Sequence, residues 1–441
     1  MNGGFDRPRP VAGGAMRVAY DVSFCADLFS ISEAVTGVGR VIENVARQLV
    51  GGGSVNLRMV GRRGGDPRPA LTSARARIYW QNRWAQPGCD FLETVGSRTG
   101  LLRVYSRALA RANRLSGGEI SLPGILLRKG LNALSRTDAH PASLTSQCDL
   151  FHSSFHPLPL ESFAGPCVLT LHDLFPLSEP QGSYNRSVTE ACLRRLDPAR
   201  CWLICDSEYT KNEFFATVPF PSDRAVVGPL AADTAFHPRP DPLDCRALLS
   251  RLELDDRPFF LSVANAQPRK NLAFLVRCFQ EFAARDATHH LLLVGSRKMG
   301  WGHEPIERQI NAVPGVSSRI HLVGPVMDEE LAVLYSHCTA FVFPSLAEGF
   351  GLPPLEAMQC GAPVICSNAT SLPEVTGDAA LQVIPTDFQG IVDALRRTAS
   401  EPTLRAELSG RSLRRAARFS WERTARIVEE TYRTAMAASR A

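Results

Sequence analysis

The sequence FPSLAEGFGLPPLEAMQCGAPVICSNATSLPEVTGD, at residues 343–378, carries more structural information than any other stretch of the chain. An apolar strand ends at Phe343, and a loop with two glycines follows it. Pro353 and Pro354 then begin a helix, at positions where the missing N–H of proline does no harm, and Gly361 ends it. Strand, loop and helix in this order predict a ligand site at the beginning of the helix.

Two glutamates of this stretch, Glu348 and Glu356, are separated by seven residues. A helix that begins after a loop of small residues presents free backbone N–H groups to an anion, and a diphosphate fits there. Carboxylates beside a phosphate need other partners, and sugar hydroxyls are suitable donors. Alternatively, Glu356 in the first turn complements the helix dipole and Glu348 is solvated. The spacing alone leaves both interpretations open.

Regular alternation of strands and helices surrounds this stretch. Apolar runs at 259–264, 290–295, 319–323, 340–343 and 363–367 predict strands, and helical patterns at 271–285 and 329–337 lie between them. Nearly continuous apolar strands are typical of a parallel sheet that helices cover on both faces. The second half of the chain is therefore predicted to be a doubly wound α/β domain.

The first half alternates less regularly. Its predicted strands are 17–21, 56–60, 149–151, 167–171 and 201–205, its predicted helix is 38–49, and residues 61–148 show no clear order. A Pro- and Asp-rich stretch at 237–242 predicts a linker. We expect doubly wound domains at 1–240 and 241–418, and an amphipathic helix over 419–441 that packs back toward the first domain. Ligands of such sheets bind beyond the carboxyl ends of the strands, so we expect the site in a cleft between the two domains.

The composition, with 44% hydrophobic and 21% charged residues in a chain of 441, is that of a soluble globular protein. A formal charge of +5 is too small and too scattered to indicate nucleic-acid binding. The twelve cysteines show no Cys-x2-Cys spacing, which argues against a zinc site. No signal peptide or membrane-spanning run is recognisable, so we expect a cytoplasmic protein with reduced cysteines.

The stretch that begins at Glu348 resembles the retaining glycosyltransferases of family 4, which have the GT-B fold of two Rossmann-like domains facing across a cleft. The matching residues are Glu348, Gly349, Phe350, Gly351, Pro354, Glu356, Ala357, Gly361, Pro363, Val364, Pro373, Glu374, Val375, Gly377 and Asp378. SVANAQPRKN at 262–271 resembles the phosphate-contacting turn of the family, and Phe419–Trp421 its closing residues. The resemblance is strong from about residue 257 to the end.

The amino-terminal half resembles the family in shorter segments that follow in order. These segments are Thr36–Arg40, Leu171–Leu174, Cys205–Lys211 and the Asp-x-x-Phe-x-Pro run at 233–238. The family includes many bacterial mannosyltransferases and glucosyltransferases of surface polysaccharide synthesis. The resemblance therefore implies a hexosyltransferase whose donor is a nucleotide diphosphate sugar. GDP-mannose is favoured as the donor, and a glucose donor comes next.

The resemblance also implies roles for individual residues. The residues that it implies for donor binding are Gly37, Gly39, Arg269, Lys270, Glu348, Gly349, Phe350, Gly351, Leu352 and Glu356. Those that it implies for catalysis are His172, Lys270 and Glu348. Glu348 contacts the hydroxyls of the transferred sugar and Glu356 the ribose. Arg269 and Lys270 neutralise the departing diphosphate, although an ordinary basic helical turn is the alternative. Where the family often has Gly followed by Arg or Thr, this chain has Ala264–Asn265, which puts more of the phosphate contact on Lys270 and the backbone.

The first half contributes candidates with open alternatives. His172 is expected to bond the donor sugar or organise the reaction centre, and a capping or core histidine is the alternative. Asp173 either supports the backbone or orients His172. Gly37 and Gly39 allow the first loop to approach the donor phosphate, and a tight turn is the alternative.

The family retains the anomeric configuration, and in the usual proposal the departing diphosphate oxygen deprotonates the acceptor. The chain has no Asp-x-Asp, so we expect no metal ion and no other cofactor. The resemblance implies a saccharide or polyprenyl-diphosphate-linked acceptor. Two alternatives are a sugar-nucleotide epimerase of similar fold and a catalytically silent nucleotide-binding scaffold.

A basic, apolar stretch in the first half suggests contact with an anionic membrane at its inner face. Arginines recur at helical spacing among apolar residues, namely Arg103, Arg107, Arg111 and Arg114 with Leu101, Leu102, Tyr105 and Leu109. Such a helix can dock on an anionic surface. A solvated helix face is the alternative.

Overall fold

The computed structural model describes residues 15–25, 37–61, 76–77, 79–81, 88–91, 147–155, 163–178, 181, 184–295 and 303–440. The basic stretch predicted to dock on a membrane lies outside these residues. The chain divides into two compact units. The first unit comprises Met1–Asp206, Glu213–Gly228 and Trp421–Ala441, and the second comprises Ser207–Asn212 and Pro229–Ser420.

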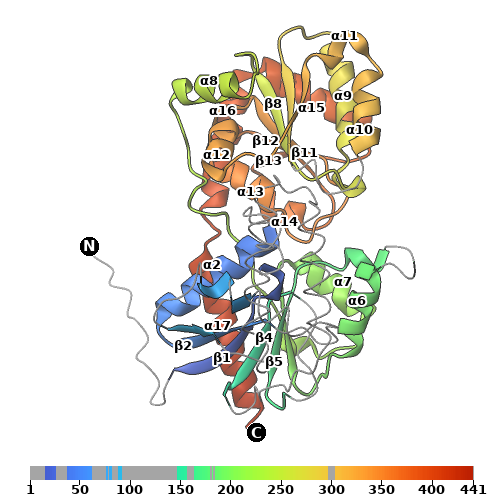
Figure 1. Cartoon of the computed structure of the whole chain (residues 1–441). Coiled ribbons are helices and arrows are strands. Elements are labelled where there is room, and N and C mark those ends of the chain that lie inside the picture. Colours follow the sequence, from blue (N-terminus) through green and yellow to red (C-terminus); the bar gives the residue numbers. More distant parts are fainter. Residues whose placement is uncertain are drawn as a thin grey trace, which may run out of the picture. The chain divides into compact units, whose positions relative to one another are not determined.

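The first unit contains a parallel sheet with the order β3-β2-β1-β4-β5-β6-β7. Its strands are β1 (Met16–Asp21), β2 (Val55–Val60), β3 (Cys89–Phe91), β4 (Leu150–Ser153), β5 (Cys167–Leu171), β6 (Cys201–Cys205) and β7 (Ala225–Val227). β5 and β6, with the sequences CVLTL and CWLIC, are buried at every residue because helices cover both faces of the sheet (Figure 1). The strand order reverses between β1 and β4.

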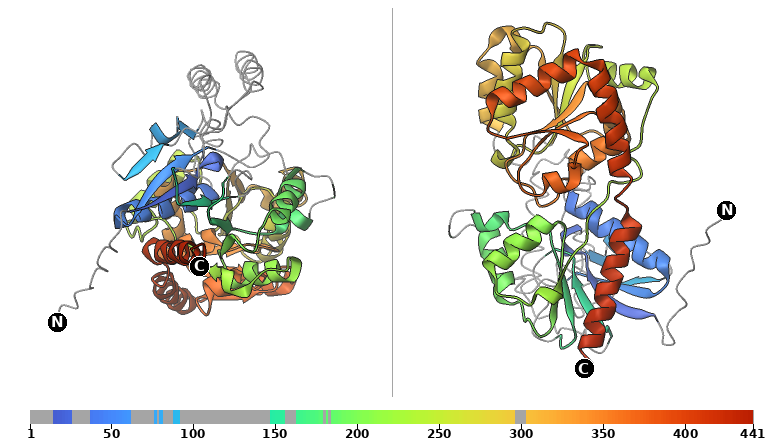
Figure 2. Two further views of the ribbon diagram at one scale, coloured as in Figure 1. Left: turned by 90° about the horizontal axis from the view of Figure 1, so that it is seen from below. Right: turned by 180° about the vertical axis from the view of Figure 1, so that it is seen from behind.

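Helices α2 (Gly37–Gly52), α6 (Tyr184–Arg194), α7 (Glu208–Thr217) and α17 (Trp421–Ala438) and the short 3-10 turns η1 (Phe175–Ser178) and η2 (Ser222–Arg224) accompany this sheet. The first residues of α7 group with the second unit and the rest with the first. α17 comes from the end of the chain and packs against α2, β5, β6 and β7 (Figure 2). The ring of its Tyr432 is fully buried, and its hydroxyl lies 2.5 Å from Nδ1 of His152. α17 is therefore part of the first unit's core.

The second unit contains a parallel sheet with the order β10-β9-β8-β11-β12-β13. Its strands are β8 (Phe259–Val263), β9 (His290–Val294), β10 (Ile320–Val323), β11 (Ala340–Phe343), β12 (Val364–Ser367) and β13 (Ala380–Val383). Counted along the chain, this is the 3-2-1-4-5-6 order of dinucleotide-binding sheets, and it reverses between β8 and β11. Both units are thus Rossmann-like, and the predicted GT-B fold class is confirmed.

The second unit's helices are α8 (Pro242–Arg251), α9 (Leu272–Ala283), α10 (His303–Asn311), α11 (Pro314–Ser317), α12 (Asp328–His337), α13 (Leu352–Gln359), α14 (Leu372–Thr376), α15 (Phe388–Ser400) and α16 (Pro402–Ala416), with η3 (Pro268–Lys270) after β8. Local capping accounts for some helix starts: the Asp241 side chain accepts from the Leu243 N–H, and Pro242 occupies the first turn of α8. The Pro- and Asp-rich stretch expected as a linker therefore ends in a helix cap, while the second unit already resumes at Pro229.

Apolar side chains of each sheet and its helices form a separate core in each unit. Phe151 and Phe214 are fully buried in the first, and Phe260 and Phe279 in the second. All twelve cysteines are buried free thiols. Within the described ranges, no helix has the length and apolarity that crossing a membrane requires.

Candidate active site

Two loops of the second unit lie together at the point where its strand order reverses. The Leu346 N–H, in the loop after β11, donates to the carbonyl oxygen of Arg269 at 2.7 Å. The Ser345 hydroxyl donates to the same oxygen at 3.0 Å. Arg269 belongs to η3, which follows β8. A doubly wound sheet has its ligand crevice at such a reversal, so these loops form the candidate site of this unit.

Glu348 lies at the centre of these loops and is ion-paired with both predicted cations. Lys270 Nζ is 2.6 Å from Glu348 Oε1, and Arg269 Nη1 is 3.0 Å from Glu348 Oε2. Arg269 Nη1 also donates to the Ala347 carbonyl oxygen at 2.9 Å. All three charged residues were predicted for the site, but the ion pairs between them were not.

This cluster contains two cations and one carboxylate. Burial by itself raises the pKa of the Glu348 carboxyl, but the charges of Lys270 and Arg269 outweigh it and the pKa is lowered. Glu348 is thus ionised, and two cations share one carboxylate. Lys270 Nζ also lies 5.3 Å from the centre of the Phe343 ring. An anionic ligand bound at these loops would meet both cations.

The loop from Glu348 to Gly351 is held in one conformation by its neighbours. Gly351 has φ 114°, and a Cβ there would lie 2.7 Å from Leu372 Cδ2, so only glycine fits. The Ser371 hydroxyl contacts the carbonyl oxygens of Glu348 and Phe350 at 2.8 and 2.9 Å. These contacts fix the backbone that the predicted diphosphate would approach.

The start of α13 supplies fewer N–H donors than the sequence analysis expected. α13 begins at Leu352, and Pro353 and Pro354, which have no N–H, occupy its next two positions. Among the described residues, the backbone N–H groups of 349–352 have no hydrogen-bond acceptor. The donors available to an anion are therefore those of the glycine loop and of the first helical residue.

Glu356 is in the second turn of α13, and the prediction that it lies in the first turn was wrong. The helix begins at Leu352, one residue before its prolines, so Glu356 is the fifth helical residue and lies in the second turn. Its carboxylate is buried, and Oε2 accepts a hydrogen bond from the Tyr335 hydroxyl at 3.3 Å. Complementing the helix dipole, which acts in the first turn, is therefore not its role.

A segment after β6 binds the same glycine loop, and the sequence analysis gave it no role in the site. The hydroxyls of Ser207 and Thr210 donate to the Gly349 carbonyl oxygen at 2.7 and 3.1 Å. The Glu374 carboxylate accepts from the N–H groups of Glu208 and Tyr209 at 2.8 and 2.7 Å, which satisfies the start of α7. The only signal in the sequence was the order of Ser207, Thr210 and Glu374 within the segments that resemble family 4.

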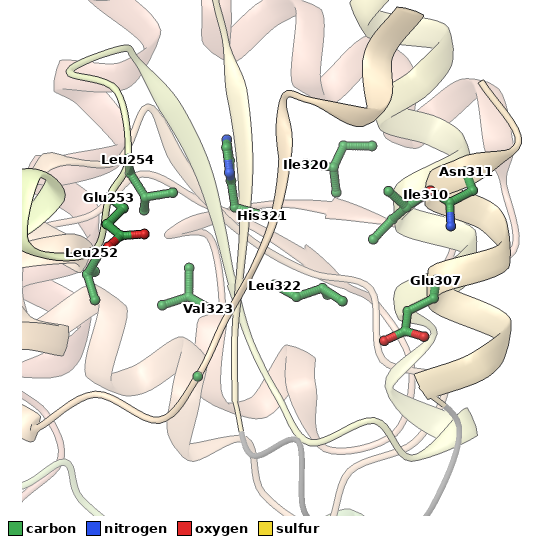
Figure 3. A pocket seen from close by; sticks show the side chains of 11 residues that line it. Leu252, Glu253, Leu254, Glu307, Ile310, Asn311, Ile320, His321, Leu322 and Val323 are labelled. Carbon is green, nitrogen blue, oxygen red and sulfur yellow. The ribbon is translucent and has the colours of Figure 1, made fainter. Parts of the chain in front are cut away.

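Neither a metal-binding cluster nor the cavity at the sheet edge provides a competing site among the described residues. Within the described part of the chain, no three His, Cys, Asp or Glu side chains are grouped to hold a metal ion. A cavity of about 550 Å³ lies along the edge strand β10, lined by Leu252–Leu254, Glu307, Ile310, Asn311 and Ile320–Gly324 (Figure 3). It contains none of the predicted site residues and lies at the sheet edge away from β11.

In the first unit, His172 follows β5 and is almost fully buried. Its Nδ1 is 2.7 Å from Asp206 Oδ2, and its Nε2 is 3.0 Å from the Ser154 carbonyl oxygen. Phe155 stacks on its ring with the centroids 5.9 Å apart. Burial lowers the pKa of His172, but the Asp206 carboxylate outweighs burial, so the pKa is raised.

Asp206, rather than Asp173, orients His172. Asp173 Oδ1 accepts from the Phe175 N–H at 3.3 Å, so it supports the backbone, which was the other interpretation of this residue. Asp206 directly follows β6, which pairs with β5, the strand that ends before His172, and this pairing is a property of strand order that no local pattern encodes. The carboxyl ends of adjacent parallel strands meet at one edge of a sheet.

Gly37 and Gly39 lie inside a helix rather than in a loop. They are the first and third residues of α2, and Gly39 is buried there. A pair of glycines signals a break in the sequence, yet here the helical pattern after residue 38 extends back through them. Their predicted approach to a phosphate would come from the first turn of α2.

Part of the second unit matches a known family, and relatives match longer stretches of the chain. A family profile described as "Glycosyl transferases group 1" matches residues 257–401. The O-antigen chain mannosyltransferase B of Escherichia coli is 32% identical over 258 residues, which cover 58% of this chain and 67% of that protein. A serotype-specific mannosyltransferase WbdA of Escherichia coli is 35% identical over 187 residues, but this match spans only 23% of its length and 42% of this chain.

Similarity to solved structures extends over both units. The crystal structure of Anabaena Alr3699/HepE in complex with UDP-glucose matches with a TM-score of 0.63 and 14% identity, over 95% of this chain and all of that one. At this identity the match concerns the fold alone, and it agrees with the two Rossmann-like units. Taken with the profile and the mannosyltransferase relatives, it leads to one conclusion: the chain belongs to the glycosyl transferases group 1 family and is a hexosyltransferase.

Proposed function

We propose that this enzyme transfers mannose from GDP-mannose to a saccharide acceptor, free or linked to a polyprenyl diphosphate, in the synthesis of a cell-surface polysaccharide. It works in the cytoplasm, at the inner face of the membrane. Mannose is supported by the names of the two Escherichia coli relatives. A nucleotide diphosphate sugar is supported by the UDP-glucose complex of the Anabaena protein. Guanine as the base rests on the resemblance to family 4.

The observation that carries this proposal is the pair of cations on the single buried carboxylate of Glu348. Negative charge develops on the diphosphate oxygen as its bond to the sugar breaks. Lys270 and Arg269 stabilise that charge, and they do so strongly because the cluster is largely shielded from water. Arg269 can bind a phosphate through two N–H groups, whereas Lys270 acts as a point charge.

Glu348 changes partners during this cycle. Without donor, it neutralises Lys270 and keeps the ammonium group in place. When Lys270 and Arg269 bind the diphosphate instead, Glu348 accepts hydrogen bonds from hydroxyls of the mannose. The N–H groups of 349–352 bind phosphate oxygens, and Glu356 accepts from the ribose. We assign His172 a part in holding the donor sugar.

Configuration is retained, and the departing oxygen of the diphosphate takes the proton of the acceptor hydroxyl. No separate protein base is then needed. Lys270 and Arg269 provide the positive charge that a metal ion would otherwise supply, so neither a metal nor another cofactor takes part. Rate enhancement comes from positioning and electrostatics.

The test begins with ligand-observed NMR binding of GDP-mannose, GDP-glucose, UDP-glucose, ADP-glucose and dTDP-glucose to the purified chain. We expect GDP-mannose to bind most tightly and to remain bound in EDTA. Transfer to oligosaccharide and polyprenyl-diphosphate-linked acceptors is then followed, and the one-bond C1–H1 coupling of the product reports its anomeric configuration. An inverted product contradicts retention, preference for another nucleotide contradicts the donor, and conversion of the donor without any acceptor indicates an epimerase.

A further inference from the structure

Two buried histidines lie near the carboxyl ends of neighbouring strands in the first unit, and their surroundings differ. His172 follows β5 and faces a carboxylate and a carbonyl oxygen. His152, in β4, faces the hydroxyls of Tyr432 and Thr170, at 2.5 Å from Nδ1 and 2.8 Å from Nε2. A hydroxyl can donate or accept, whereas a carbonyl oxygen and a carboxylate oxygen only accept. The contacts of His152 therefore fit a neutral ring as well as a charged one, whereas His172 faces two oxygens that cannot donate.

His172 needs a proton on each ring nitrogen. Nδ1 is 2.7 Å from Asp206 Oδ2 and Nε2 is 3.0 Å from the Ser154 carbonyl oxygen, so both nitrogens must donate. A neutral imidazole has one N–H and would turn a lone pair toward one of these oxygens. The imidazolium cation satisfies both contacts with a single orientation of the ring.

The same contacts are also satisfied if the proton between His172 and Asp206 resides on the carboxyl group. Ordinary pKa values, about 6.5 for histidine and about 3.9 for aspartate, place the proton on the ring. Among the described residues, Asp206 Oδ1 has no hydrogen-bond partner, so the carboxylate depends on the His172 cation for its stabilisation. Each charge of the pair thus stabilises the other in its buried position.

Charged groups around the ring agree with a cation. Asp206 reaches it from the end of β6, and Asp173 adds a second negative charge from the next position in the chain. His152, from β4, is the titratable group on the other side, and its pKa is lowered to about 3 by burial and by the charge of His172. Phe155 covers one face of the ring and carries no charge.

We propose that Asp206 is a positioning residue that keeps His172 as an imidazolium cation, so that His172 serves as a fixed positive charge and cannot act as a general base. The contacts require a proton between each ring nitrogen and its oxygen, and ordinary pKa values place the shared proton on the ring. Its consequence for sugar transfer rests on the proposed function, in which the diphosphate oxygen deprotonates the acceptor and a positive charge assists its departure.

The first test is independent of activity. In the full chain with ¹⁵N-labelled histidine, the ring nitrogens are followed by NMR from pH 5.5 to pH 8.5, with His172→Gln used for assignment. We expect both nitrogens of His172 to remain protonated throughout, and His152 to remain neutral. An unprotonated nitrogen of His172 at pH 7 in the wild type overturns the proposal, whether the proton is lost or resides on Asp206.

Asp206→Asn provides the second test. The amide can donate to Nδ1, so we expect His172 to become neutral at pH 7 while the chain remains folded by circular dichroism. Asp173→Asn is the matched control: it removes a neighbouring carboxylate whose own hydrogen bond is to the Phe175 N–H, and the ring should stay protonated. An imidazolium that persists in folded Asp206→Asn overturns the proposal. If Asp206→Asn fails to fold, the wild-type spectrum still shows whether both ring nitrogens of His172 are protonated.

Kinetics then separate this inference from the proposed function. We expect kcat for mannose transfer to be nearly independent of pH from 6 to 8 in the wild type. In Asp206→Asn it should fall about tenfold or more at pH 8 and recover partly toward pH 6, as the ring regains its proton. A wild type that transfers no mannose but shows the imidazolium refutes only the proposed function. An active wild type with a neutral His172 refutes only this inference.

Discussion

Each unit buries oppositely charged side chains where its parallel strands end, but the ratio of cations to carboxylates differs. In the first unit, one histidine faces one carboxylate, His172 with Asp206, and both are almost inaccessible to solvent. In the second unit, the carboxylate of Glu348 faces two cations. The first cluster pairs one cation with one carboxylate, whereas in the second two cations contact one carboxylate. The difference indicates that the first pair fixes a ring and the second binds an anion.

The positions of the two clusters in their sheets match these roles. Lys270 and Glu348 come from the loops after β8 and β11, the strands between which the order reverses. A ligand crevice forms at such a reversal. His172 and Asp206 follow β5 and β6, which lie beyond the reversal of the first sheet, so their side chains meet as neighbours within a continuous edge.

Removing one cation from the second cluster should have the largest effect. In Lys270→Ala, Glu348 keeps Arg269 as its partner, and one of the two cations is lost. We expect kcat for mannose transfer to fall about a hundred- to a thousandfold, because the charge on the departing diphosphate loses its main stabilisation. Initial rates at saturating donor measure this.

Arg277→Ala is the control for that variant. Arg277 is exposed on α9, where its guanidinium lies 5.1 Å from the Phe388 ring, and its removal changes the net charge of the unit by the same amount. We expect kcat to change less than twofold. Equal losses in both variants would mean that total charge, and not the cluster, matters.

Glu348→Gln tests the same cluster through stability. Two buried or half-buried cations lose their counter-charge, and we expect the free energy of unfolding at pH 7 to fall by about 3 kcal/mol in urea titrations. Because the pKa of Glu348 is lowered in the fold, its stabilising contribution is present above its ordinary value of 4.5 and is lost as the pH falls through the lowered pKa.

The difference in stability between wild type and Glu348→Gln should therefore shrink below about pH 4.5. Urea titrations of the two proteins at several pH values measure this convergence. A constant difference down to acid pH would show that the cations do not hold the carboxylate in its ionised form.

Glu356→Ala should have a smaller effect, and on binding. Glu356 lies outside the ion-paired cluster, with the Tyr335 hydroxyl as a partner. We expect Kd for GDP-mannose to rise about tenfold, equivalent to about 1.4 kcal/mol, with kcat little changed. Glu329→Ala, an exposed glutamate in α12, is the control and should bind donor normally. A loss of kcat without loss of binding would place Glu356 at the reacting atoms.

Much of the second cluster could be predicted from the sequence, and its internal pairing could not. Lys270 and Glu348 each follow an apolar strand, which marks them as edge residues. That β8 and β11 are neighbours is a property of strand order, which no local pattern encodes, so the ion pair remained hidden. Asp206 was missed for the same reason, since its partner precedes it by a whole strand and helix.

Errors in the sequence analysis came from helix starts. Glu356 was placed in the first turn because the prolines were taken as the beginning of the helix, whereas Leu352 precedes them. Gly37 was assigned to a loop because glycine favours breaks, although α2 includes it. Both helices begin one residue earlier than predicted, and a periodic apolar pattern does not fix a boundary to one residue.

The smallest effect is expected from Glu374→Gln, which concerns the segment directly after Asp206. The Glu374 carboxylate accepts from the Glu208 and Tyr209 N–H groups, and a glutamine side chain can accept only one of these bonds. We expect a loss of about 1 kcal/mol in the free energy of unfolding, typical of a helix cap. Asp387→Ala, which removes the ordinary cap of α15, calibrates this measurement.

In Glu374→Gln, the hydroxyls of Ser207 and Thr210 still hold Gly349, so the His172 imidazolium and donor binding should both persist. If Glu374→Gln alters either of them, the two charged clusters are coupled through this segment and do not act separately.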